Sequence, residues 1–205
     1  MDSQIFKIDI IEKSLAIAEE IYHQVERGIY CEGKLSDIIN KVRWNIEETV
    51  SILGTEDLLR SKTIIENSII KCTTEYCEYF EKINILTEYL LECYDKFSAF
   101  GMTTECEHVS MICNQIRHGI RSSEELDYIL KEVNWVAHTL GVVGIPHDVV
   151  TLHNVGDFFR ESYYDSRISC EKLKMGLSEY IGALKGYRNM LESLLSDISQ
   201  TIMVI

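Results

Sequence analysis

A single proline, Pro146, occurs in this chain of 205 residues. Proline has no backbone N–H and its ring clashes with the preceding turn, so the interior of a helix excludes it. At average usage a chain of this length would contain about ten prolines. The scarcity favours long, uninterrupted helices, and we therefore predict an all-α fold.

Two long stretches repeat apolar residues at alternating steps of four and three. The first series comprises Ile65, Ile69, Cys72, Tyr76, Tyr79, Ile83, Leu86, Leu90, Cys93 and Phe97. The second comprises Phe159, Tyr163, Ser166, Cys170, Leu173, Leu177, Tyr180, Leu184, Tyr187 and Leu191, and continues through Leu194 and Ile198. This heptad spacing is typical of helices that pack side by side at shallow angles. We expect each series to form the buried face of a long helix.

Part of the sequence occurs twice. Residues 21–44 and 112–135 align without gaps at an offset of 91, with eight identities in 24 positions. The shared residues include the only two tryptophans, Trp44 and Trp135, and the glycines Gly28 and Gly119. The two heptad series match at an offset of 94. A fixed period of this kind is the mark of a repeated structural unit, so we predict a tandem duplication of a helical hairpin of 91–94 residues.

Each repeat is expected to have a first limb broken near Gly28 or Gly119 and a long second limb. Glycine followed by isoleucine at both places indicates a left-handed helix stop. Ser122 with Glu125 three residues later indicates the start of the next helix. The predicted helices of repeat 1–101 are about 6–27, 35–52 and 57–97, and those of repeat 102–205 are about 104–118, 124–140 and 155–202. The difference in offset places three extra residues in the connection that contains Pro146.

The apolar stripe of one hairpin has no partner within that hairpin. Two hairpins related by a pseudo-twofold axis would bury both stripes, so we expect the repeats to pack as one elongated helical bundle. Gly182 and Gly186 lie four residues apart, on one helix face. They indicate either a place where another helix approaches closely or incidental small residues on a tolerant surface.

The formal net charge of −13 and the absence of clustered lysine and arginine argue against nucleic acid as a partner. No stretch approaches the roughly 20 apolar residues of a membrane span, and residues 1–14 lack the pattern of a secretory signal. Seven cysteines without a disulfide-type spacing fit a reducing compartment. We expect a cytoplasmic protein, although secretion by a signal-independent route stays open.

Two Glu-x-x-His motifs are the strongest candidates for metal chemistry. They comprise Glu20 with His23 and Glu105 with His108. Ferritin-like bundles hold two metal ions with such motifs, because residues at i and i+3 share a helix face. The motifs here lie 85 residues apart, whereas the repeat offset is 91, so they would not occupy equivalent depths. We therefore expect surface residues, with no metal, cofactor or catalytic group assigned.

The unit size and hairpin form resemble the small helical-hairpin proteins of type VII secretion systems. The resemblance covers each repeat in outline and implies a secretion-associated binding role. The chain departs from that family's Trp-x-Gly turn, since Trp44 precedes Gly54 by ten residues and Trp135 precedes Gly141 by six. The terminal Tyr-x-x-x-Asp/Glu pattern of that family does not occur at the ends of the long helices either.

The sequence favours a non-enzymatic protein-interaction module, such as an adaptor, an escort or a secretion-associated binding protein, that acts through an acidic helical surface. Its partner would be another protein, and self-association into a homo-oligomer stays open. The alternative is a metal-dependent four-helix-bundle enzyme of the ferritin-like di-metal type, using Glu20, His23, Glu105 and His108.

Overall fold

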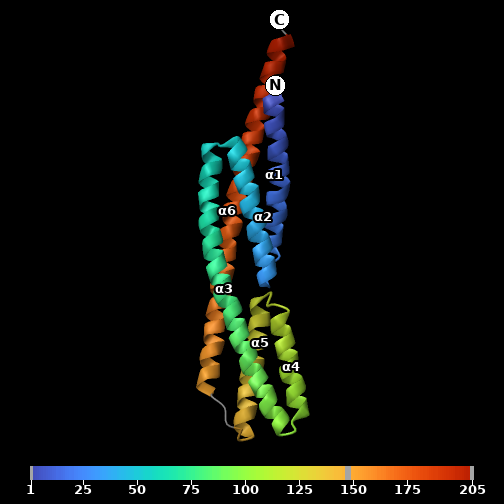
Figure 1. Ribbon diagram of the computed structural model, residues 1–205, viewed down its shortest axis with the longest axis vertical. Coiled ribbons are helices and arrows are strands. Elements are labelled where there is room, and N and C mark those ends of the chain that lie inside the picture. Colours follow the sequence, from blue (N-terminus) through green and yellow to red (C-terminus); the bar gives the residue numbers. More distant parts are fainter. Residues whose placement is uncertain (1, 146–148, 204–205) are drawn as a thin grey trace. The chain divides into compact units, whose positions relative to one another are not determined.

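The computed structural model describes residues 2–145 and 149–203 (Figure 1), and within these ranges the chain forms six helices and no strand. The helices are α1 (Asp2–Glu26), α2 (Glu32–Leu53), α3 (Glu56–Ala99), α4 (Thr103–Arg117), α5 (Ser123–Val142) and α6 (Val149–Met203). The predicted all-α fold is confirmed. Pro146, which the sequence places in the connection before α6, lies outside the described residues.

The breaks at Gly28 and Gly119 are turns between separate helices. Gly28 has a φ of 88° and Gly119 a φ of 84°, which is the left-handed region that a Cβ disfavours. The isoleucines that follow, Ile29 and Ile120, are buried. Both predicted helix stops are therefore confirmed, because glycine reverses the chain and the next residue anchors it to the core.

The N-terminus of α5 carries the predicted capping interaction. The Ser122 hydroxyl accepts a hydrogen bond from the backbone N–H of Glu125 at 3.2 Å. The Glu125 carboxylate in turn accepts from the backbone N–H of Arg121 at 2.9 Å. These bonds use donors that have no partner inside the helix, which explains why α5 begins here.

Three helices begin at least three residues earlier than the apolar pattern predicts. α1 begins at Asp2 instead of residue 6, α2 at Glu32 instead of residue 35, and α6 at Val149 instead of residue 155. In α1 the added residues are mainly polar, and Asp2 lies at the positive end of the helix dipole. Apolar periodicity does not detect a polar first turn, which explains the late start predicted for α1.

The described helices group into two compact units. The terminal bundle comprises Met1–Ile29, Gly33–Cys72 and Ser169–Ile205, and the central bundle comprises Tyr30–Glu32 and Thr73–Ile168. Each unit therefore combines segments of both sequence repeats, since α3 and α6 each contribute a different part to each bundle. The repeat boundary at residue 101 is a division of the sequence and stays a prediction.

The core of the terminal bundle follows the predicted stripes. Its fully buried side chains include Ile11, Ala18, Ile21, Val25, Ile65, Ile69, Cys72, Leu173, Leu177, Tyr180 and Leu184. Another helix comes close at Gly176, where an added Cβ would lie 3.1 Å from Cγ1 of Ile65. At Gly182 and Gly186 no atom of the described residues comes within 4 Å of a built Cβ, which agrees with incidental small residues and not with a close helix approach.

The core of the central bundle is aromatic. The Tyr79 ring stacks on Phe159 with centroids 5.7 Å apart, and Tyr76, Phe80 and Tyr163 surround it. Burial raises the pKa of Tyr79 well above its usual range. These tyrosines therefore act as packing residues with protonated hydroxyls.

The heptad faces are buried along most of their length, with exceptions at Ile83 within α3 and toward the C-terminal end of α6. Ile83 and Tyr187 are half-buried, while Leu194 and Ile198 are 44% and 36% exposed. Figure 1 shows the C-terminal end of α6 extending past the N-terminus of α1 in the terminal bundle. The seam was expected to continue through Leu194 and Ile198; this is wrong, because a seam residue is buried only where a second helix lies alongside.

Candidate functional site

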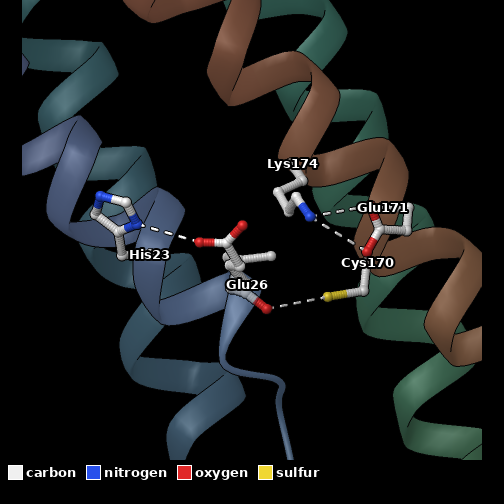
Figure 2. A network of polar contacts seen from close by, with 6 residues as sticks. His23, Glu26, Cys170, Glu171 and Lys174 are labelled. Atoms are coloured by element: carbon white, nitrogen blue, oxygen red, sulfur yellow. Dashed lines mark hydrogen bonds and ion pairs between the residues drawn. The ribbon is translucent and has the colours of Figure 1, made fainter.

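Glu20 and His23 lie on the exposed surface of α1. Glu20 accepts a hydrogen bond from Gln24 at 2.7 Å and pairs with Lys41 of α2 at 3.2 Å. His23 pairs with Glu26 at 3.2 Å (Figure 2), away from Glu20. On α6, the Lys174 ammonium pairs with Glu171 at 3.2 Å (Figure 2), and it lies 5.8 Å from the centre of the Tyr22 ring on α1. The carboxylate and the imidazole of this motif thus have separate partners.

The second motif is likewise divided between different neighbours. Nε2 of His108 lies 2.7 Å from Oε2 of Glu132, which is on α5. The His108 ring also meets Trp135 edge to face, with centroids 4.5 Å apart. Among the described residues, no group of three or more His, Cys, Asp or Glu side chains is arranged to hold a metal ion. His108 instead contacts Glu132 and Trp135, and these contacts join α4 to α5.

The terminal bundle has a small pocket between α1 and α2, with Trp44 in its wall. The pocket has a volume of about 190 Å³ and is lined by Ile10, Lys13, Ser14, Ile17, Trp44, Asn45, Glu48 and Thr49. At about 30 Å³ per water in the liquid, this space equals roughly six water molecules. It therefore suits one side chain or a very small molecule.

Three of the lining residues carry polar groups that are almost fully buried. Ser14, Asn45 and Thr49 are 3%, 3% and 2% exposed. Ser14 Oγ lies 2.9 Å from the Tyr180 hydroxyl and 2.8 Å from Thr49 Oγ1, and the Thr49 hydroxyl donates to the backbone carbonyl of Asn45 at 2.6 Å. The three hydroxyls form one chain that ends on a carbonyl. Such connected networks hold side chains in one arrangement.

Asn45 presents an unused acceptor to this pocket. Its Nδ2 donates to the backbone carbonyl of Ser14 at 3.2 Å. A carbonyl only accepts, so this contact fixes which end of the amide is the nitrogen. Oδ1 of Asn45 accepts no hydrogen bond from the residues that the structure describes. The pocket beside Trp44 thus combines apolar side chains with the charged Lys13 and Glu48 and with an amide that has one acceptor unused.

The two tryptophans lie in comparable places on their helices. Trp44 is 57% exposed on α2 and shares its pocket with Ile17 of α1. Trp135 is 42% exposed on α5 and contacts His108 of α4. Ile17 and His108 are themselves 91 residues apart. Each tryptophan thus stands beside the same position of the preceding helix, with its face largely open to solvent.

The pocket beneath Trp44 has no polar equivalent beneath Trp135. At the offset of 91, Glu105, Val136 and Leu140 replace Ser14, Asn45 and Thr49. Val136 and Leu140 are fully buried. Sequence reasoning missed the polar group because it searched for charged motifs. The available signal was the presence of serine, asparagine and threonine on stripes that are otherwise apolar.

The helices that carry the tryptophans have an excess of carboxylates. α1 and α2 together contain ten acidic and five basic side chains, excluding histidine, and α4 and α5 contain six and two. The net charges are therefore −5 and −4. Fields of this sign attract cationic surfaces.

Most of the cysteines are packed inside the bundles. Five of the seven are buried, and Cys31 and Cys77 are exposed. Burial raises the pKa of Cys72 to about 12 and that of Cys93 to about 11. A thiol with so high a pKa holds its proton at neutral pH and is a poor nucleophile.

Comparison of the chain with protein-family models, curated proteins and solved structures gives no match. Within the described residues, no helix is both long enough and apolar enough to cross a membrane.

Proposed function

We propose that this protein is a non-enzymatic interaction module that binds another protein through its tryptophan-bearing helical surfaces. The observation that carries the proposal is that the only two tryptophans of the chain are both exposed, at 57% and 42%. Tryptophan is the residue most enriched among the side chains that dominate binding energy. It contributes most when a partner covers it and excludes water.

The partner that fits these surfaces presents apolar side chains together with lysine or arginine. Apolar groups of the partner would cover Trp44 and Trp135. Basic groups would meet the net charges of −5 and −4 on the helices that carry them. Charge complementarity of this kind raises the association rate and fixes orientation. An acidic partner would be repelled.

The test uses the full chain to capture partners from its native cell. The double variant Trp44→Ala, Trp135→Ala should lose a partner that the natural sequence retains, with binding weakened by about thirtyfold or more if each ring is a dominant contact. Binding should also weaken as salt rises. Far-UV circular dichroism and thermal unfolding would show that the double variant still folds.

The matched control is Met175→Ala, which removes an apolar side chain that is 65% exposed on α6. This control should capture the same partner as the natural sequence. Equal capture by all three proteins would refute the role of the tryptophans. If the captured partner is a second copy of this chain, light scattering at rising concentration would show a homo-oligomer.

We further infer that the chain arose by tandem duplication of a helical hairpin. The supporting observations are the order of two shorter helices and one long helix, which occurs twice, and the left-handed glycines Gly28 and Gly119 at equivalent turns. The tryptophans at equivalent positions add to this. Superposition of residues 1–101 on 102–205, helix by helix, would refute the inference if the equivalent helices did not align.

The alternative proposal is a metal-dependent bundle enzyme of the ferritin-like di-metal type, and it rests on the two Glu-x-x-His motifs. Elemental analysis of the purified protein separates the two proposals. Stoichiometric iron, manganese or zinc, lost on Glu105→Gln or His108→Gln substitution, would favour the enzyme and overturn the interaction module.

A further inference from the structure

The central bundle contains a second and larger cavity, an open groove of about 800 Å³ between the end of α3 and the length of α4. Its lining comprises Tyr94, Ser98, Gly101, Met102, Thr103, Cys106, Glu107, Ser110, Met111, Asn114, Gln115, His118 and Glu125. This volume lies within the range of small-molecule sites in proteins. Neither tryptophan lines the groove, so it is a separate cavity, although Glu107 and Glu125 belong to the helices that surround Trp135.

Among the polar groups that line the groove, one buried acceptor has no hydrogen-bond donor. Oε1 of Gln115 is buried and accepts no hydrogen bond in the described structure. A buried carbonyl oxygen in this state costs free energy that a donor would restore. Nδ1 of His118 lies 2.7 Å from the backbone carbonyl of Asn114 and therefore donates to it. In the neutral ring, Nε2 is then also an acceptor.

The charge of the groove is negative. Glu107 and Glu125 line it, and no lysine or arginine does. Glu125 uses Oε2 to accept the backbone N–H of Arg121, which leaves Oε1. Glu107 has no cationic partner among the residues that the structure describes. A ligand that satisfies both Gln115 Oε1 and these carboxylates supplies a hydrogen-bond donor and a positive charge.

The remaining wall of the groove is apolar, and its methionine side chains are flexible. Met102 and Met111 contribute flexible thioethers, and Tyr94 contributes an aromatic ring that is partly exposed. The Cys106 thiol donates a hydrogen bond to the backbone carbonyl of Tyr94 at 3.6 Å, so its proton is already used within the protein. Methionine side chains adapt to ligands of different shape. This wall suits an apolar arm of three or more carbons.

We propose that this groove binds an organic ammonium group carried on an apolar arm. The ammonium group donates to Gln115 Oε1 and pairs with the Glu107 carboxylate, while the arm lies against Met102, Met111 and Tyr94. The cation belongs either to a free amine or to the lysine side chain of a polypeptide. Both sources present the same chemistry to the groove.

The test titrates 4-phenylbutylamine, 4-phenylbutanol and 4-phenylbutanoate into the isotopically labelled full chain and follows backbone amide resonances. The amine should bind saturably and shift the amides around Ser110, Asn114 and Gln115. The alcohol should bind at least tenfold more weakly and the anion should not bind. A lysine-containing peptide, titrated in parallel with its acetyl-lysine form, distinguishes a polypeptide source from a free amine.

Two substitutions test which side chains bind the ammonium group of the amine. Gln115→Met removes the buried acceptor with little change in volume and should weaken amine binding about tenfold, since hydrogen bonds to a charged group are strong. Glu107→Gln should weaken it about threefold, as expected for an exposed ion pair. The matched control is Glu105→Gln, on the same helix but outside the groove lining. It should bind the amine as the natural sequence does.

The proposal is overturned if the amine and the alcohol bind equally, or if the shifted amides lie away from α4. It is also overturned if Glu105→Gln weakens binding as much as Glu107→Gln, because the effect would then reflect net charge alone. Each outcome is independent of the tryptophan substitutions. Failure of the interaction proposal would therefore leave this result unchanged.

Discussion

Substitution of Gly119 by alanine tests how the turn between α4 and α5 is built. Gly119 has a φ of +84°, and an added Cβ would lie 2.5 Å from the Cβ of Tyr30 and 2.8 Å from its backbone oxygen. Both atoms are fixed to the backbone, so a side-chain rotation cannot relieve the contact. Two costs therefore act together at this position: left-handed strain and overpacking.

The expected loss of stability follows from these two costs. A left-handed conformation costs a non-glycine residue about 1–2 kcal/mol. Overpacking at a rigid contact costs about 1–3 kcal/mol more. We therefore expect Gly119→Ala to lower the free energy of unfolding by roughly 2–5 kcal/mol, measured by urea denaturation with far-UV circular dichroism.

Two other glycines of the central bundle separate the contributions. Gly101 has a φ of +71° with no atom within 4 Å of an added Cβ, so Gly101→Ala should cost only the strain, about 1–2 kcal/mol. Gly156 is helical, and Leu130 Cδ2 lies at an ordinary 3.6 Å, so Gly156→Ala should stabilise by about 0.5–1 kcal/mol. If Gly119→Ala cost no more than Gly101→Ala, the packing of Tyr30 against this turn would be refuted.

Three further predictions follow from the caps, the polar network and the buried thiols. Ser122→Ala should cost about 1 kcal/mol of stability through loss of the α5 cap, and an unchanged urea midpoint would contradict it. Ser14→Ala should cost about 1–3 kcal/mol, and Tyr180→Phe should cost less in that background than alone, because the two hydroxyls are 2.9 Å apart. The raised pKa values of Cys72 and Cys93, about 12 and 11, predict that stability falls as the pH rises above about 9, because the unfolded thiols lose protons first. The slope between pH 9 and 11 should reach about 1.4 kcal/mol per pH unit for each thiol, and it should shrink when both are replaced by alanine.

Much of this fold could be predicted from the sequence, because the features that define the helices act over short distances along the chain. The heptad series identified the buried face of α3, because a period of four and three places residues on one side of a helix whatever the helix packs against. The sequence also predicted the helix stops at Gly28 and Gly119 and the cap at Ser122, because each of these interactions involves only residues that are close in sequence. The functional groups were harder to predict. Asn45 and Gln115 carry no motif, and each matters only through what surrounds it.

The amino-acid sequence by itself determined that the chain is all-helical, that it turns at Gly28 and Gly119, and which faces of the long helices are largely apolar. Tertiary structure alone decided that α3 and α6 each divide between two compact bundles, that Glu20 pairs with Lys41 and His108 with Glu132, and that one acceptor lies beside Trp44 and another along α4. The physical reason is the distance along the chain over which each kind of interaction acts. Helix propensity and capping act over one or two turns, whereas a pocket or an ion pair between helices needs residues that the chain brings together only on folding.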